Sequence, residues 1–98
     1  MTGRTTSADV PVGFNLIKAY PNPFNPTTTI KVQLREAGFA SISVYNVNGQ
    51  MVKELYKGKM GVTPSSFTFD ANDLPSGVYV VKVSSSKYVS QKKLVLMR

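Results

Sequence analysis

Apolar and polar residues alternate with a period of two along this chain, and that alternation limits the folds it can adopt. In residues 27–34, TTTIKVQL, the apolar residues Ile30, Val32 and Leu34 fall on one side of an extended backbone. The same alternation recurs in residues 40–47 and 78–84. No window keeps the i, i+3, i+4, i+7 spacing of an amphipathic helix. We therefore expect an all-β fold.

Turn-forming residues divide the chain into about seven strands. Asn48-Gly49 predicts a β-hairpin with a type I′ turn, because both central residues of that turn need φ > 0. The glycine-rich residues 57–65 are expected to form a loop. The expected strands are residues 16–20, 27–34, 40–47, 51–56, 66–70, 78–84 and 88–98. Their even spacing is typical of an antiparallel β-sandwich.

The alternation also predicts which side chains face the core. Phe67 and Phe69 share one face of their strand. The other residues expected to face inward are Ile30, Val32, Leu34, Ala40, Ile42, Val44, Tyr79, Val81 and Val83. Those expected to face solvent are Ser41, Ser43, Tyr45, Lys82 and Ser84.

Three prolines stiffen the connection between the first two strands, in AYPNPFNPTTTI (19–30). Each proline fixes its own φ, lacks an N–H donor and pushes the preceding residue towards extended geometry. We expect an extended connection with few hydrogen bonds. Two interpretations of Pro21-Asn22-Pro23 stay open: a rigid corner alone, or a corner that also presents a contact surface to a receptor.

A tyrosine follows a turn in LPSGVY (74–79). This pattern predicts a tyrosine corner, in which the hydroxyl of Tyr79 bonds to backbone a few residues upstream. Gly77 would supply a backbone conformation that other residues adopt poorly. Antibody domains carry a cysteine two residues after this tyrosine, but here that residue is Val81. We expect an immunoglobulin-like sandwich without a disulfide.

Composition argues against catalysis and against metal binding. The chain contains no cysteine and no histidine, which removes thiolate sites, the usual general base and the commonest metal ligand. Asp70, Asn72 and Asp73 offer oxygen ligands, but calcium takes six or more. A turn with Asx-type hydrogen bonds explains them better. We expect no catalytic residue, no cofactor and no metal.

The net charge of +7 could attract nucleic acid, anionic lipid or lipopolysaccharide. Five basic residues fall in the last 17, where there is no acid: Lys82, Lys87, Lys92, Lys93 and Arg98. The simpler explanation is the solvated face of a strand. A surface that binds nucleic acid would place exposed aromatic side chains between these charges. Tyr79 is instead expected to face the core, so we expect no nucleic-acid partner. Cross-strand packing is the preferred explanation for the remaining aromatics Tyr20, Tyr45, Tyr56 and Tyr88.

Residues 1–14 are polar and rich in Thr, Gly and Ser, which predicts a linker or flexible leader before a domain over residues 15–98. The start has no signal-peptide pattern. We expect a piece of a longer chain.

Four segments occur in a fixed order: YPNPFNPTTTIKVQL (20–34), SVYNVNGQMVKEL (43–55), LPSGVYVVKV (74–83) and KKLVLMR (92–98). Together they resemble the C-terminal sorting domain, type A group, of type IX secretion cargo proteins from Bacteroidetes and related bacteria. By this resemblance the recognition residues are Pro21, Asn22, Pro23, Gly77, Tyr79, Lys93, Leu94, Val95, Leu96, Met97 and Arg98. Asn46 departs from the pattern, because many members have an acidic residue there.

The resemblance implies a non-catalytic signal domain behind N-terminal cargo domains. Its partners would be an outer-membrane translocon and a sortase-like protease that removes the domain and joins the cargo to lipopolysaccharide. The cargo would pass through the periplasm to the cell surface or be secreted. A monomer or a weak dimer is expected.

Two alternatives remain open. The immunoglobulin-like module of flagellar hook-capping proteins shares the proline-asparagine and Gly-x-Tyr patterns, so the domain could instead be a structural spacer or an accessory binding module of a multidomain enzyme or adhesin. Residues 94–97 form either a closing edge strand alone or also a site where a partner adds a strand.

Overall fold

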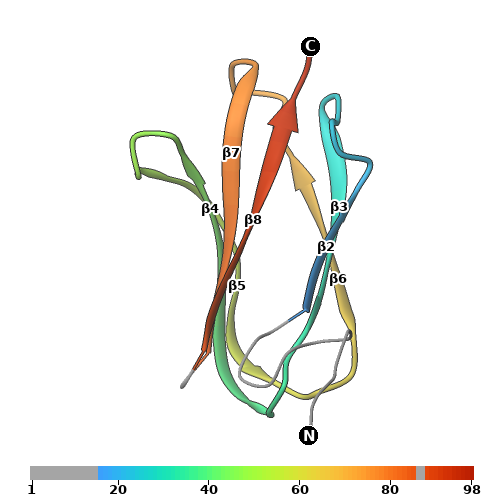
Figure 1. Ribbon diagram of the computed structural model, residues 1–98, viewed down its shortest axis with the longest axis vertical. Coiled ribbons are helices and arrows are strands. Elements are labelled where there is room, and N and C mark those ends of the chain that lie inside the picture. Colours follow the sequence, from blue (N-terminus) through green and yellow to red (C-terminus); the bar gives the residue numbers. More distant parts are fainter. Residues whose placement is uncertain (1–15, 86–87) are drawn as a thin grey trace, which may run out of the picture.

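Two antiparallel sheets pack face to face in the computed structural model, which describes residues 16–85 and 88–98 (Figure 1). One sheet has the strand order β2-β3-β6 and the other β5-β4-β7-β8. The strands are β2 (Leu16–Tyr20), β3 (Thr27–Gln33), β4 (Gly38–Asn46), β5 (Met51–Met60), β6 (Ser65–Asp70), β7 (Gly77–Ser85) and β8 (Val89–Leu96). These seven strands, with no helix in the described residues, confirm the all-β sandwich. No helix there could therefore span a membrane. The expected leader, residues 1–14, lies outside the described residues.

The core lies between the sheets and includes most of the residues that the alternation predicts, together with Phe24, Met60, Ala71, Leu94 and Leu96. Those buried to 4 % exposure or less include Ile30, Val32, Leu34, Ala40, Ile42, Val44, Phe69, Tyr79, Val81 and Val83. Phe67 is half-buried, and its ring centroid lies 5.5 Å from that of Tyr56. Tyr56 on β5 thus packs against β6 of the opposite sheet, and not against a paired strand of its own sheet as expected.

Ser43 is expected to face solvent, but this prediction is wrong, because the residue is only 2 % exposed. Ser43 lies in the central strand β4 and is paired with Lys82 of β7 on one side and with Glu54 of β5 on the other. A small side chain between two long ones on the same sheet face is shielded by them.

The strand β5 is longer than its sequence predicts. Residues 57–60 were expected in a loop, yet they continue the strand because β4 begins at Gly38 and pairs Gly38 with Met60. The register shifts twice along this pair, between Ile42 and Ser43 and between Val44 and Tyr45. Such irregularities are common on edge strands, where they bend the strand and discourage pairing with another chain.

The hairpin between β4 and β5 is confirmed, but its turn is not type I′. The N–H of Gly49 donates to the carbonyl of Asn46 at 3.0 Å, so Val47 and Asn48 are the central residues of the turn. Gly49 follows with a φ of 83°. A bonded turn followed by a left-handed residue is the three-residue hairpin loop. Within this turn, the position that requires glycine is therefore Gly49.

Asn46 holds this turn with its side chain. Its Oδ1 accepts hydrogen bonds from the N–H groups of Asn48 at 2.9 Å and Gln50 at 3.0 Å. A carboxylate oxygen at the same position could accept both bonds. An aspartate at this position could therefore do the same structural work as the asparagine.

The edge strand β8 carries a charged residue on its core-facing side. Ser90, Leu94 and Leu96 on that side are buried, but Lys92 between them is exposed. A charge placed on the inner side of an edge strand disfavours the addition of another strand.

We predict that Asn46→Ala lowers the free energy of unfolding by about 1 kcal/mol, because two turn N–H groups lose their acceptor. Asn46→Asp should stay within about 0.5 kcal/mol of the wild type, since it keeps the two bonds that Oδ1 accepts and loses only the exposed bond from Nδ2 to Gln50. Urea unfolding measures both, and Asn48→Ala is the matched control in the same turn. Equal losses for the alanine and aspartate variants would contradict the acceptor role.

Candidate functional site

The connection between β2 and β3, residues 21–26, is a bent loop and not the extended segment that its prolines predict. Its three X-Pro bonds are cis. The prolines contribute acceptors: Thr28 donates its hydroxyl to the carbonyl of Pro21 at 2.7 Å, and the N–H of Ala71 donates to the carbonyl of Pro26 at 2.9 Å. The loop is thus tied to β3 and to the turn after β6.

Phe24 fixes this loop in the core. The residue is 2 % exposed, and its ring centroid lies 5.7 Å from that of Phe69. Its N–H donates to the carbonyl of Val95 at 2.9 Å, and its carbonyl accepts from the N–H of Met97 at 3.0 Å. Phe24 therefore forms a parallel bridge opposite Leu96, at the outer edge of β8.

Asn22 extends the contact along the same edge. Its Nδ2 donates to the carbonyl of Lys93 at 2.9 Å, and its Oδ1 accepts from the N–H of Val95 at 3.0 Å. One side-chain amide thus takes the place of the backbone of a neighbouring strand. We call residues 21–26 and 93–98, joined by the bonds of Asn22 and Phe24, the loop–tail clamp.

Arg98 attaches the end of the clamp to the turn that follows β6. Its Nε donates to the carbonyl of Leu74 at 2.9 Å, and its Nη2 donates to the carbonyls of Ala71 at 2.8 Å and Asn72. Its backbone N–H donates to the hydroxyl of Ser76 at 3.1 Å. Hydrogen bonds from a charged guanidinium are stronger than those between neutral groups. The last residue therefore holds this turn closed.

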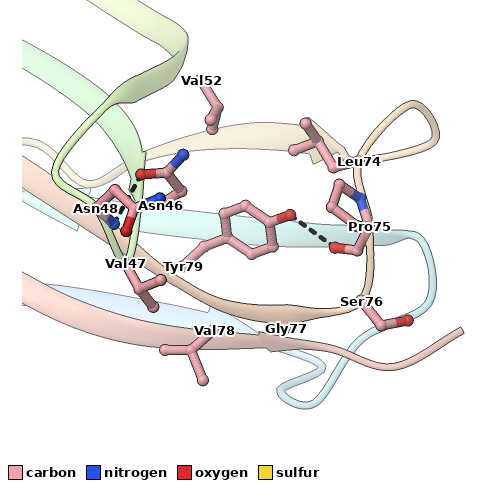
Figure 2. A pocket seen from close by; sticks show the side chains of 10 residues that line it. All are labelled: Asn46, Val47, Asn48, Val52, Leu74, Pro75, Ser76, Gly77, Val78 and Tyr79. Atoms are coloured by element: carbon pink, nitrogen blue, oxygen red, sulfur yellow. Dashed lines mark hydrogen bonds between the residues drawn. The ribbon is translucent and has the colours of Figure 1, made fainter.

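The predicted tyrosine corner is present at the other side of that turn (Figure 2). The hydroxyl of Tyr79 donates to the carbonyl of Pro75 at 2.6 Å, while its ring is 4 % exposed. Gly77 has a φ of 152°, and a Cβ added there would meet nothing within 4 Å. Backbone conformation, and not lack of space, therefore explains this glycine. A hollow of about 280 Å³ lies between Tyr79, the β4–β5 hairpin and this turn.

The Asx-type turn expected at residues 70–73 is confirmed, because Oδ1 of Asp70 accepts the N–H of Asn72 at 3.0 Å. In residues 16–85 and 88–98, no three acidic, histidine or cysteine side chains gather as a metal site would need.

The structure brings most of the proposed recognition residues to one end of the sandwich, where the β2–β3 loop, the start of β7 and the C-terminus lie (Figure 1). It divides them by exposure. The exposed ones are Pro21, Asn22, Pro23, Gly77, Lys93, Met97 and Arg98, whereas Leu94, Leu96 and Tyr79 are buried and Val95 is half-buried. The buried residues hold the fold, so only the exposed ones can meet a receptor directly.

The sequence did not predict the clamp, because its partners lie 71 and 73 residues apart along the chain. The one available signal was Phe24, a large apolar residue among prolines. The bonds of Asn22 and Phe24 also occupy the backbone edge of β8 at residues 93–97. Strand addition there requires that the loop first move away.

The chain matches one family model, described as a secretion system C-terminal sorting domain, over residues 18–97. The match spans the loop, the Gly-x-Tyr element and almost all of the tail, and it confirms the resemblance found from these motifs. No curated protein matches the chain.

We predict that Asn22→Ala lowers the free energy of unfolding by about 1–2 kcal/mol, because it leaves two backbone groups of β8 without partners. Hydrogen exchange at the N–H of Val95 should accelerate at the same time, since local opening exposes that group. Urea unfolding and exchange monitored by NMR measure the two effects. Asn25→Ala, in the same loop, is the control, and unchanged protection of Val95 would contradict the clamp.

For the tyrosine corner, we predict that Tyr79→Phe costs about 1–1.5 kcal/mol, because the carbonyl of Pro75 loses its donor while the buried ring remains. Tyr20→Phe, which removes a hydroxyl from a residue that is 82 % exposed, should change the stability little. Thermal and urea unfolding of the two variants make the comparison. Equal stability of Tyr79→Phe and the wild type would show that the bond contributes nothing.

Proposed function

The chain belongs to the family of secretion system C-terminal sorting domains, and we propose that the loop–tail clamp is the part that the type IX export machinery recognises. A domain of this family is carried by a larger cargo protein and marks it for the cell surface or for secretion. The proposal concerns which residues carry the signal and what happens to the cargo afterwards.

One observation carries the proposal: two motifs of the family, far apart in sequence, are bonded into a single unit. Asn22 lies 71 residues from its partner Lys93. Within this unit the exposed residues are the presented surface, and the buried ones keep it in shape. A receptor would therefore meet Pro21, Asn22 and Pro23 together with Lys93, Met97 and Arg98 and not a linear peptide.

The chemistry of this surface suggests how it would be bound. Lys93 is exposed and Met97 is 58 % exposed, so the surface offers a cation and an apolar side chain at a rigid corner. The donors of Arg98 are already engaged by carbonyls of the turn. We infer a receptor that contacts side chains, with an acidic group for Lys93 and an apolar group for Met97. Pre-organised surfaces of this kind bind with a small loss of conformational entropy.

The proposal extends to the fate of the cargo on the strength of family membership. A sortase-like protease at the outer membrane would remove the domain, and the cargo would be attached to the cell surface, including to lipopolysaccharide. The domain itself would act without catalysis. The lack of histidine and cysteine in the sequence supports that assignment.

The test is a reporter fused to residues 15–98 behind a periplasmic signal, in a bacterium that has the type IX machinery. We predict that the wild-type fusion reaches the surface or the medium and that deletion of residues 93–98 leaves it in the periplasm. The double variant Lys93→Glu/Met97→Ser should lower export at least fivefold with little change in stability, because both side chains are exposed. Lys57→Glu, on β5, is the control.

The outcomes separate the two levels of the proposal. A wild-type fusion that stays in the periplasm would contradict the export role of this chain and favour a structural spacer. If the double variant and the deletion are both exported as well as the wild-type fusion, the family assignment stays intact. The clamp would then not be the recognised surface.

A further inference from the structure

A pair of like charges lies on the outer face of the three-stranded sheet, and export does not explain it. Lys18 of β2 and Lys31 of β3 are direct cross-strand partners, and both are exposed. Within the described part of the chain, neither lysine has an ion-pair or hydrogen-bond partner. Like charges placed directly opposite each other destabilise a sheet. An anion bound between the two ammonium groups would remove this repulsion.

An exposed aromatic ring lies beside the two lysines. Tyr20 follows Lys18 by two residues, so both side chains project from the same face of β2. Tyr20 is 82 % exposed and is paired with the small residue Thr29. Cross-strand packing, which the sequence suggested, is therefore wrong for Tyr20. Its ring face is open to a ligand.

These side chains surround one shallow hollow of about 340 Å³. It is lined by Lys18, Tyr20, Thr29 and Lys31. Two cations, a hydroxyl group and an aromatic ring thus border the same space. The exposed hydroxyl side chains of Thr27, Thr68 and Ser66 continue along this sheet face beside it.

We propose that this hollow binds an acidic sugar residue of an oligosaccharide. The carboxylate would lie between the ammonium groups of Lys18 and Lys31, the C–H face of the sugar would stack on Tyr20, and Thr29 would hydrogen-bond a sugar hydroxyl. Charged groups and an aromatic ring around a hollow are the elements of a specific small-ligand site. The exposed hydroxyl side chains beside the hollow offer hydrogen-bond partners to neighbouring sugars of the same oligosaccharide.

The arrangement favours a sugar over a nucleic acid. Binding of single-stranded nucleic acid relies on successive stacked aromatics along a basic groove. In the described residues, Tyr20 is the one aromatic that lines this hollow. The inference goes beyond the export role and does not depend on it.

The test is isothermal titration calorimetry of the 98-residue chain with hexagalacturonate. The methyl ester of hexagalacturonate is the second ligand, because it keeps the sugar rings but lacks the negative charges. We predict binding of the acid and not of the ester. Lys18→Gln/Lys31→Gln should weaken the affinity at least tenfold, Tyr20→Ala at least fivefold, and Tyr20→Phe less than twofold. The matched control is Lys57→Gln/Lys59→Gln, which removes the same charge from β5 and should leave the affinity within twofold. Amide shifts in NMR should map to β2 and β3.

Four results would overturn the proposal. The first is no binding of the acid at millimolar concentration. The second is an equal loss for the two double-lysine variants, which would indicate attraction by net charge alone. The third is tighter binding of a single-stranded DNA oligonucleotide through the same residues. The fourth is a Lys18→Gln/Lys31→Gln variant that self-associates while its affinity is unchanged, which would show that the lysines only protect the edge of β2.

Discussion

The hydrogen bonds from Asn22 and Phe24 to the outer edge of β8 are the interaction on which the closed sandwich depends. The loop belongs to the three-stranded sheet and β8 to the four-stranded sheet, so these bonds tie the two layers together at one end. Packing of Phe24 against Phe69 places the same residue in the core. A domain without disulfides needs such a link, because its two sheets are otherwise joined by side-chain packing and by loops.

The turn after β6 is held from two sides. The hydroxyl of Tyr79 bonds to the carbonyl of Pro75 on one side, and the guanidinium of Arg98 bonds to carbonyls of residues 71, 72 and 74 on the other. The loop–tail clamp ends at Arg98, so the turn, the tail and the proline-rich loop form a continuous hydrogen-bonded unit. A substitution in one part should change the stability of the others, since groups in one hydrogen-bonded network are energetically coupled.

Local patterns predicted the strands and the tyrosine corner because the residues involved lie close together in sequence. The bounds of β2 were correct, and Tyr79 bonds only four residues upstream. The errors occurred where tertiary pairing overrides local preference. Pairing with the start of β4 keeps residues 57–60 in β5, and neighbours on both sides bury Ser43. The turn type at Gly49 was missed because Asn48-Gly49 alone does not determine which residues close the turn.

The candidate site was predictable as a set of residues but not as a structure. Family resemblance indicated the proline-rich loop and the tail, but not that Asn22 bonds to the tail or that Leu94 and Leu96 face the core. Contacts between residues about 70 positions apart do not affect the two-residue alternation from which the strands were predicted. The surface around Tyr20 was missed for a related reason, because exposure of an aromatic ring depends on which small residues lie opposite it.

The lysine on the inner side of β8 has a consequence for how copies of this domain behave when crowded. The outer edge of β8 is covered only towards its C-terminal half, where the loop bonds to it. Lys92 stands just before that cover, so docking of a neighbouring sheet against the uncovered half would bury an unpaired ammonium group at a large desolvation cost. Lys92 therefore disfavours the edge-to-edge association of folded copies of this domain at high concentration.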